Sequence, residues 1–190
     1  MPLLQTNDII HKKRGSAEET YFPDISLHGG RAICVCGESG SGKGLFLRMA
    51  SGLIIPKYGT CTMEDVSTGF IFLTEGLLNN YSIFDNLMIP LLFSNREDKG
   101  EELVLRTLEK FKLLNIKDFL AGELPGSAKR MAQYARADII QPKILFIEEP
   151  LHNVKPHYHS LIKDWLSWFI NDARGACLFT SSEKIWDFLP

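Results

Sequence analysis

The sequence lacks any apolar run as long as the ~18 residues that a membrane-spanning helix requires. Its 190 residues carry a net charge of −2, so no excess of basic residues indicates binding to nucleic acid or to an anionic membrane surface. The first residues also lack the basic segment and apolar core of a secretion signal. We therefore expect a cytoplasmic protein that reaches a membrane only through a partner.

Cysteine is scarce, and none of the four cysteines shows the spacing of a zinc site. Cys34 and Cys36 lie two residues apart in an apolar run, so both side chains should point to one face of a strand. Free cysteines are usually buried. We expect reduced, buried thiols at Cys34, Cys36, Cys61 and Cys177.

Apolar residues make up 45% of the chain and charged residues 23%, which is typical of a globular protein. Buried strands are predicted at 32–36, 69–73, 143–147 and 176–180, and helices at 45–53, 99–119, 127–140 and 161–170. Strands that alternate with helices favour an α/β fold with a parallel sheet covered on both faces. We predict a single domain over 1–190, with a core of about 20–76 and 141–190 and a helical insertion of about 77–140.

The strongest motif is the run from Gly37 to Lys43, which fits G-x-x-x-x-G-K between a predicted strand and a predicted helix. Glycines allow successive backbone N–H groups to turn inward and bind an anion, and the helix N-terminus adds a partial positive charge. A lysine at this place contacts the β and γ phosphates of a nucleotide. The predicted nucleotide-binding residues are Gly37, Ser39, Gly40, Ser41, Gly42, Lys43 and Gly44.

Gly44 departs from this motif, which normally ends in a serine or threonine whose hydroxyl binds Mg²⁺. Phosphates can still occupy the loop, but the metal loses one protein ligand. The motif therefore predicts ATP as the ligand and makes its dependence on Mg²⁺ doubtful.

Two carboxylates, Glu148 and Glu149, end the apolar strand at 143–147. In phosphate-loop ATPases the first such carboxylate holds the metal or its water, and the second accepts a proton from the attacking water. We assign Glu148 to Mg²⁺, through water, and Glu149 together with Lys43 to catalysis. Taken alone, however, the pair is more typical of a solvated strand end than of a catalytic site, because charged residues usually lie in water.

Further segments resemble the ATP-binding subunits of ABC transporters. The segments 124–130 and 134–137 resemble the signature region, 24–27 and 51–56 resemble the flanks of the phosphate loop, and 82–86 with 89–91 most resemble the ATPase of Mla/Mce-type phospholipid transporters. The resemblance implies a P-loop NTPase fold, specifically an ABC nucleotide-binding domain. It also implies a transmembrane permease and a second ATP-binding subunit as partners, lipid transport, and a place on the cytoplasmic face of the inner membrane.

The same resemblance places several family positions on unsuitable residues. The Q-loop glutamine falls on Leu73, the signature serine on Pro125 and its second glycine on Ser127, the D-loop aspartate on Lys155 and the switch histidine on Ser181. No aromatic residue for stacking on adenine is found near Arg14. A lost orienting or acid–base group typically costs ~10²–10⁴-fold in rate. We therefore expect a degenerate ATPase with weak or no hydrolysis. The resemblance implies that each nucleotide lies between two subunits, so the changes at Pro125, Ser127 and Lys155 should also impair the site on a partner subunit.

Other interpretations remain open from the sequence. The chain is either a catalytically impaired transporter subunit, an unusual but active ATPase that uses Glu149, or a non-transport, kinase-like protein with a lid at 94–99. The histidines at 152, 157 and 159 are either a metal site or, as we favour, part of a solvated loop. Trp165 and Trp168 indicate a core or an interface, and 87–93 either the permease-facing surface or core.

Overall fold

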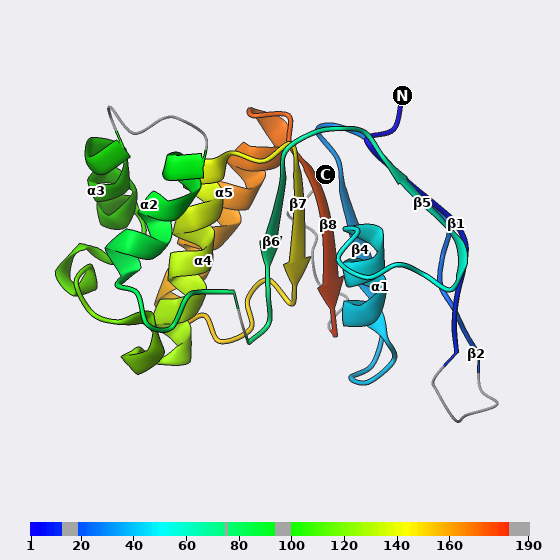
Figure 1. The fold of residues 1–190 in the computed structure, drawn as a ribbon, viewed down its shortest axis with the longest axis horizontal. Helices are drawn as coiled ribbons and strands as arrows, with labels where there is room; N and C mark the ends of the chain where they lie inside the picture. The colour runs from blue at the N-terminus through cyan, green and yellow to red at the C-terminus, as the bar shows by residue number, and fades with distance from the viewer. Residues whose placement is uncertain (13–18, 75, 94–99, 183–190) are drawn as a thin grey trace. The chain divides into compact units, whose positions relative to one another are not determined.

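The computed structural model describes residues 1–12, 19–74, 76–93 and 100–182, which divide into two compact units. The first unit comprises 1–68, 143–150 and 166–190, and the second comprises 69–142 and 151–165. Figure 1 shows the strands of the first unit and the helices of the second. The predicted single domain, with its core and insertion, stays a prediction.

The first unit contains parallel strands in the order β4 (Ala32–Cys36), β8 (Ala176–Ser181) and β7 (Ile144–Glu148). Cys36 lies opposite Ser181, and Glu148 lies opposite Thr180. Because the strands are parallel and in register, their carboxyl ends meet at one edge of the sheet. Helix α1 (Lys43–Ala50) packs on β7 and β8 through an apolar face that includes Phe46 and Leu47.

A second sheet in this unit was not predicted from the sequence. Its strands are β1 (Leu4–Lys12), β2 (Glu19–Tyr21), β3 (Ile25–Leu27) and β5 (Tyr58–Met63), and β1 pairs antiparallel with each of the others. The β1–β5 register shifts between Asn7 and Ile10. Gly59 lies there with φ +81°, and an added Cβ would lie 2.3 Å from the Asp8 carbonyl oxygen. Only glycine fits this close approach.

The second unit is mainly helical, as predicted for most of this region. It contains α2 (Ile83–Phe93), α3 (Gly100–Lys110), α4 (Gly126–Ile140), residues 159–165 of α5 (His159–Asn171), and short 3-10 turns at Leu114–Ile116, Ala121–Glu123 and Pro156–Tyr158. Strand β6 (Thr68–Ile71) leads into it. Helices α2, α3 and α4 pack against one another around a core that includes Leu87, Leu108 and Tyr134.

The helix predicted at 99–119 ends early, at Lys110. Lys112 adopts φ +60°, a left-handed conformation that ends a helix, and the Leu113 N–H donates to the Leu108 carbonyl. The amphipathic pattern continues into the turn at Leu114–Ile116, which explains why the periodicity overestimated the length of the helix.

Candidate functional site

The loop from Gly37 to Gly42 connects β4 to α1, as the motif predicts. The Gly37 N–H donates to the Ser181 carbonyl of β8, which fixes the start of the loop. Gly42 precedes the first turn of α1 with φ +89°, and an added Cβ would lie 3.3 Å from the Phe22 ring, which stacks on Phe46. A left-handed residue in contact with an aromatic ring favours glycine at this position.

The Lys43 side chain is nearly buried and folds back onto the loop that precedes it. Its ammonium donates to the carbonyl of Gly37 at 2.6 Å and to that of Glu38 at 2.8 Å. The Glu149 carboxylate lies 3.7 Å from the same nitrogen. The structure therefore brings the two residues assigned to catalysis, Lys43 and Glu149, to the same place.

Glu149 follows β7 with φ +47° and is held by the end of β8. Its N–H donates to the Thr180 carbonyl, and its carboxylate accepts the Ser182 N–H at 3.0 Å and the Ser182 hydroxyl at 2.8 Å. Ser182 was not identified from the sequence, because the switch position was assigned to Ser181. Ser181 instead is buried and anchors Gly37 through its carbonyl.

Glu148 points to α1 rather than to solvent. Its carboxylate oxygen Oε1 accepts a hydrogen bond from Arg48 Nε at 3.0 Å, and the side chain is 6% exposed. A Cβ added at Gly44 would lie 3.1 Å from the same oxygen. Glu148, the predicted metal-binding residue, therefore lies beside the place that a side chain at position 44 would occupy. Arg48 was not identified from the sequence, because its partner lies 100 residues away.

Of the other family positions, Leu73, Pro125, Ser127 and Lys155 lie in the second unit. Pro125 precedes α4, and its carbonyl accepts the N–H groups of Ala128 and Lys129. Arg130, a signature-region residue that matches the family, is buried, and its Nη1 donates to the Phe72 carbonyl. Gln133 accepts the Phe72 N–H at 2.8 Å, so two α4 side chains hold the backbone just before Leu73. The region of Arg14 and the lid at 94–99 lie outside the described residues.

Of the four thiols expected to be buried, only Cys177 is buried, whereas Cys34 and Cys61 are half-buried. Cys34 and Cys36 do share a strand face, with their sulfur atoms 3.1 Å apart, but Cys36 is exposed. Burial raises the pKa of the Cys34 and Cys177 thiols above the ordinary value, so both stay protonated near neutral pH. The prediction of buried thiols is therefore confirmed for Cys177, holds only in part for Cys34 and Cys61, and is wrong for Cys36, which lies at the strand end where the loop begins.

The predicted histidine cluster has ordinary local contacts. The His159 ring contacts the Val154 carbonyl at 2.9 Å, and the His157 ring lies against Tyr158. Across the described ranges, no three or more His, Cys, Asp or Glu side chains are grouped so as to hold a metal ion.

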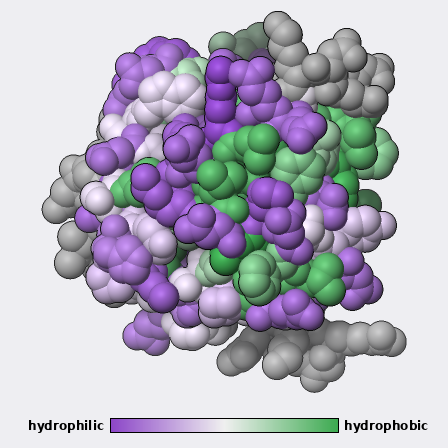
Figure 2. All heavy atoms as spheres, turned by 90° about the vertical axis from the view of Figure 1, so that its left-hand side faces the viewer, coloured by the Kyte–Doolittle hydropathy of each residue, from purple (hydrophilic) through white to green (hydrophobic). Residues whose placement is uncertain are grey.

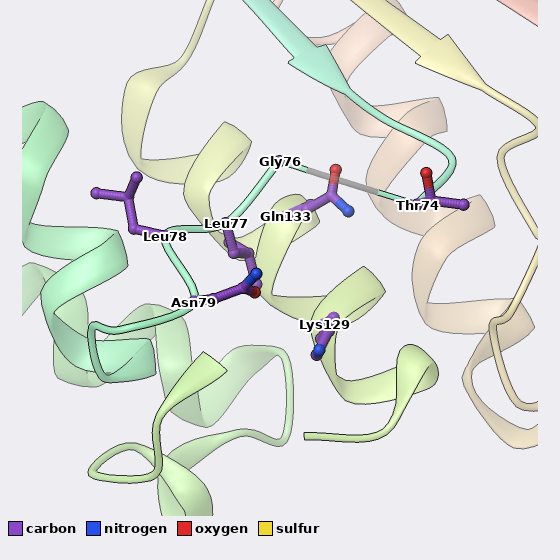
Figure 3. Close-up of a pocket in the computed structure, with 7 residues that line it drawn as sticks. All are labelled: Thr74, Gly76, Leu77, Leu78, Asn79, Lys129 and Gln133. Atoms are coloured by element: carbon purple, nitrogen blue, oxygen red, sulfur yellow. The ribbon is translucent and has the colours of Figure 1, made fainter. Parts of the chain in front are cut away.

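A pocket of about 560 Å³ lies in the second unit, between α4 and the segment before α2 (Figure 3). The segment keeps its shape through Asn86, whose side chain is buried, accepts the Leu78 N–H at 2.7 Å and donates to the Leu78 and Ser82 carbonyls. Ser82 and Asp85 cap α2 reciprocally. The family-like run 82–86 thus shapes one wall of the pocket, whose lining residues are Thr74, Gly76, Leu77, Leu78, Asn79, Lys129 and Gln133.

Comparison with known proteins assigns the class. A family model described as ABC transporter matches residues 23–152, which is more than half of the chain. The chain therefore belongs to the ABC transporter family.

Among solved structures, a dimeric bacterial ABC transporter cassette matches with a TM-score of 0.86 and 18% identity, over 98% of this chain and 91% of that one. A cassette in a post-hydrolysis state bound to ADP and Pi matches with a TM-score of 0.85 and 17% identity, over 95% and 88%. The expected fold, an ABC nucleotide-binding domain with a parallel sheet and helices, is confirmed.

Two curated relatives illustrate the similarity in sequence. The sulfate/thiosulfate import ATP-binding protein CysA of Mesostigma viride is 28% identical over 174 residues, 84% of this chain and 49% of that protein. The lipoprotein-releasing system ATP-binding protein LolD of Buchnera aphidicola subsp. Acyrthosiphon pisum is 30% identical over 161 residues, 75% of this chain and 71% of that protein. The chain spans about half the length of the CysA relatives it matches.

Proposed function

We propose that this chain is an ATP-binding subunit of an ABC transporter, with the nucleotide phosphates bound by the loop from Gly37 to Gly44. The observation that carries the proposal is the convergence of Lys43, Gly44, Glu148 and Glu149 at one edge of the parallel sheet. Ligands of open α/β sheets bind at the carboxyl ends of the strands, where this loop lies. Family membership, with CysA and LolD both named as ATP-binding proteins, supports the same ligand.

The residues beside the loop fit a bound Mg²⁺ poorly. Gly44 has no side-chain oxygen to offer as a ligand, and the Glu148 carboxylate is already hydrogen-bonded to Arg48. Stabilisation of the transferring phosphoryl group depends on the metal in enzymes of this kind. We therefore propose that the chain binds ATP with little help from Mg²⁺ and hydrolyses it slowly, so that it acts as an impaired, regulatory member of its transporter.

An unusual but active ATPase is the second candidate, because Glu149 lies 3.7 Å from the Lys43 ammonium. A carboxylate beside the phosphate-binding lysine is placed to accept a proton from an attacking water. Ser182 holds this carboxylate through two hydrogen bonds, however, and these must be exchanged before Glu149 can serve as a base.

Binding and turnover of ATP distinguish the two candidates. We expect the purified chain to bind ATP in calorimetry and to release phosphate at least ~100-fold more slowly than the ~10 s⁻¹ of a median enzyme, because several orienting groups are absent. Glu149→Gln should leave the ATP affinity within threefold of the parent. Fast, Mg²⁺-dependent turnover that Glu149→Gln abolishes would establish the active ATPase instead. Absence of any ATP binding would remove both candidates.

For partners, we propose a transmembrane permease and a second ATP-binding subunit, reached at the cytoplasmic face of the inner membrane. Within the described ranges no helix combines the length and apolar character needed to cross a bilayer. Figure 2 shows apolar side chains gathered among polar ones on one face. The exposed large apolar residues described in the second unit are Leu78, Tyr81, Leu92, Phe93, Leu114, Phe119 and Leu120. Exposed apolar surface of this kind marks a protein interface.

Leu78 offers a direct test of the permease interface, because it lines the pocket of Figure 3 and is 48% exposed. We expect Leu78→Asp to lower the recovery of a co-purifying multi-spanning membrane protein about tenfold, the effect of losing ~1.4 kcal/mol at an interface. Leu53→Asp, at a leucine of the first unit that is 56% exposed, is the matched control and should not reduce recovery. Equal recovery with both variants, or no membrane protein in any preparation, would contradict the proposal.

The transported substrate is the least constrained part of the proposal. We propose a lipid or a lipid-modified protein, because the segment 82–91 resembles Mla-type phospholipid transporters and LolD belongs to a lipoprotein-releasing system. The CysA relatives are named for sulfate and thiosulfate import, so the identity of the co-purifying permease decides the substrate class.

A further inference from the structure

Four charged side chains lie around the position where the phosphate loop meets α1. The Glu148 carboxylate lies on β7, Arg48 lies on α1, and the Lys43–Glu149 pair lies at the start of α1 and the end of β7. Gly44 and Arg48 are four residues apart on α1 and so share one helix face, which is turned toward the end of β7. Glu148 Oε1 is 3.0 Å from Arg48 Nε and 3.1 Å from where a Cβ at Gly44 would lie.

The absence of a side chain at Gly44 leaves room for this ion pair. A Cβ 3.1 Å from Glu148 Oε1 is closer than ordinary van der Waals contact, so with a serine or threonine at this position the carboxylate would have to shift by a few tenths of an ångström. The side chain of Glu148 is long enough for its carboxylate to reach Arg48 on α1. The small residue at 44 and the long carboxylate at 148 are thus complementary in shape.

A buried carboxylate requires a cation or several hydrogen-bond donors, because burial disfavours its charge. The Glu148 side chain is 6% exposed, and Arg48, whose guanidinium is always protonated, supplies the positive charge from a position that is 39% exposed. A divalent metal would supply the same neutralisation in a site with a hydroxyl at position 44. Here the charge comes from the protein.

The two ion pairs, Arg48–Glu148 and Lys43–Glu149, balance the charges beside the phosphate loop. Two carboxylates, Glu148 and Glu149, would repel a polyphosphate, but Arg48 pairs with the first and Lys43 with the second. A triphosphate that carries no metal therefore meets no net negative charge at this edge of the sheet. A site without Arg48 would need a divalent cation to offset Glu148.

We propose that Arg48 replaces the divalent metal as the partner of Glu148 and so makes this site bind the metal-free form of a nucleoside polyphosphate. The inference rests on the proposed ATP-binding function and specifies the form of the ligand. Arg48 acts through Glu148 and is a positioning residue. The glycine at position 44, where the motif normally has serine or threonine, and the Arg48–Glu148 ion pair are two parts of the same adaptation.

The test measures ATP affinity by calorimetry in EDTA and in excess Mg²⁺ for the parent and four variants. We expect the parent to bind equally well, within threefold, in both conditions. Arg48→Gln exposes the Glu148 charge and should weaken binding about tenfold in EDTA, with Mg²⁺ restoring most of the loss. Glu148→Gln combined with Arg48→Gln removes both charges and should restore metal-free binding, which a merely structural role of Arg48 would not allow.

Arg106→Gln serves as the matched control, since Arg106 pairs with Glu102 on an exposed face of α3. It should change neither affinity nor metal dependence. An Arg48→Gln variant that loses affinity equally in EDTA and Mg²⁺, or a parent that gains more than tenfold from Mg²⁺, would overturn the inference while leaving ATP binding intact. No ATP binding by the parent in either condition would instead overturn the proposed function. Thermal unfolding in parallel identifies a variant that fails to fold, and Arg48→Lys, which keeps the charge, should then retain metal-free binding.

Discussion

Replacement of Trp165 by alanine is expected to lower the free energy of unfolding by ~3–5 kcal/mol, the usual cost of removing a buried aromatic side chain. Trp165 is 3% exposed and packs edge-on against Phe111 at 6.1 Å and Tyr134 at 5.6 Å between ring centroids. Its indole N–H also donates to Asp138 Oδ1 at 2.7 Å. In a chain of this length the loss corresponds to a fall in melting temperature of roughly 6–20 °C, measured by circular dichroism.

Two further variants separate the contributions at this site. Trp165→Phe keeps part of the ring volume and removes the hydrogen bond to Asp138, which retains its ion pair with Lys110, so a smaller cost of ~1–2 kcal/mol is expected. Trp168→Ala is the control, because Trp168 lies one turn further along α5 and is 39% exposed. A loss at Trp168 as large as that at Trp165 would contradict the assignment of Trp165 to the core of the second unit.

The two tryptophans illustrate how far periodicity predicts burial. Their spacing indicated a core or an interface, and only the structure distinguishes them, since it places Trp165 against α4 while Trp168 remains partly exposed. Local periodicity also predicted β4, β7, β8, α4 and α5, because these segments combine a regular apolar pattern with clear ends. The end of α3 was predicted too late because the pattern of apolar residues outlasts the helix.

The antiparallel sheet could not be predicted in the same way. Strand β1 pairs with β5, and Leu4 lies opposite Met63, far away in the sequence. The β2 and β3 strands are short, and β5 is mostly exposed, so neither carries the apolar run by which buried strands are recognised. Only the pairing between distant segments defines these strands.

In the candidate site, too, the residues in continuous sequence patterns were predicted, and the residues whose partners are distant in the sequence were missed. Lys43 and Gly44 were predicted because their motif is continuous in the sequence, and Glu148 and Glu149 because they end an apolar strand. Arg48 and Ser182 were missed, although each contacts one of these carboxylates. Their partners lie 100 and 33 residues away, and nothing in the local sequence distinguishes Arg48 from other arginines on helices. The positive charge beside Glu148 comes from Arg48, which only the tertiary structure brings next to it.

Lys43→Met is expected to weaken ATP binding about 100-fold or more, the largest effect on ligand affinity that we foresee. One charge-assisted hydrogen bond contributes ~1.5–3 kcal/mol, which corresponds to roughly 10- to 150-fold in affinity. The substitution also removes the cation that lies 3.7 Å from Glu149, so an uncompensated carboxylate would then face the phosphates. Calorimetry with ATP measures the loss, and Lys57→Met, at an exposed lysine of the same unit, is the control that should bind as the parent does.

The double variant Lys43→Met with Glu149→Gln separates the two causes. If Lys43 both contacts phosphate and neutralises Glu149, the double variant recovers the part of the affinity that repulsion removed and no more. Full recovery would mean that Lys43 only balances Glu149, and the loop would then bind phosphate through its backbone alone. No loss of affinity in the single variant would mean that ATP binds elsewhere. In that case the hydrogen bonds from Lys43 to the carbonyls of Gly37 and Glu38 would be its structural role, as a brace of the loop rather than a ligand of the nucleotide.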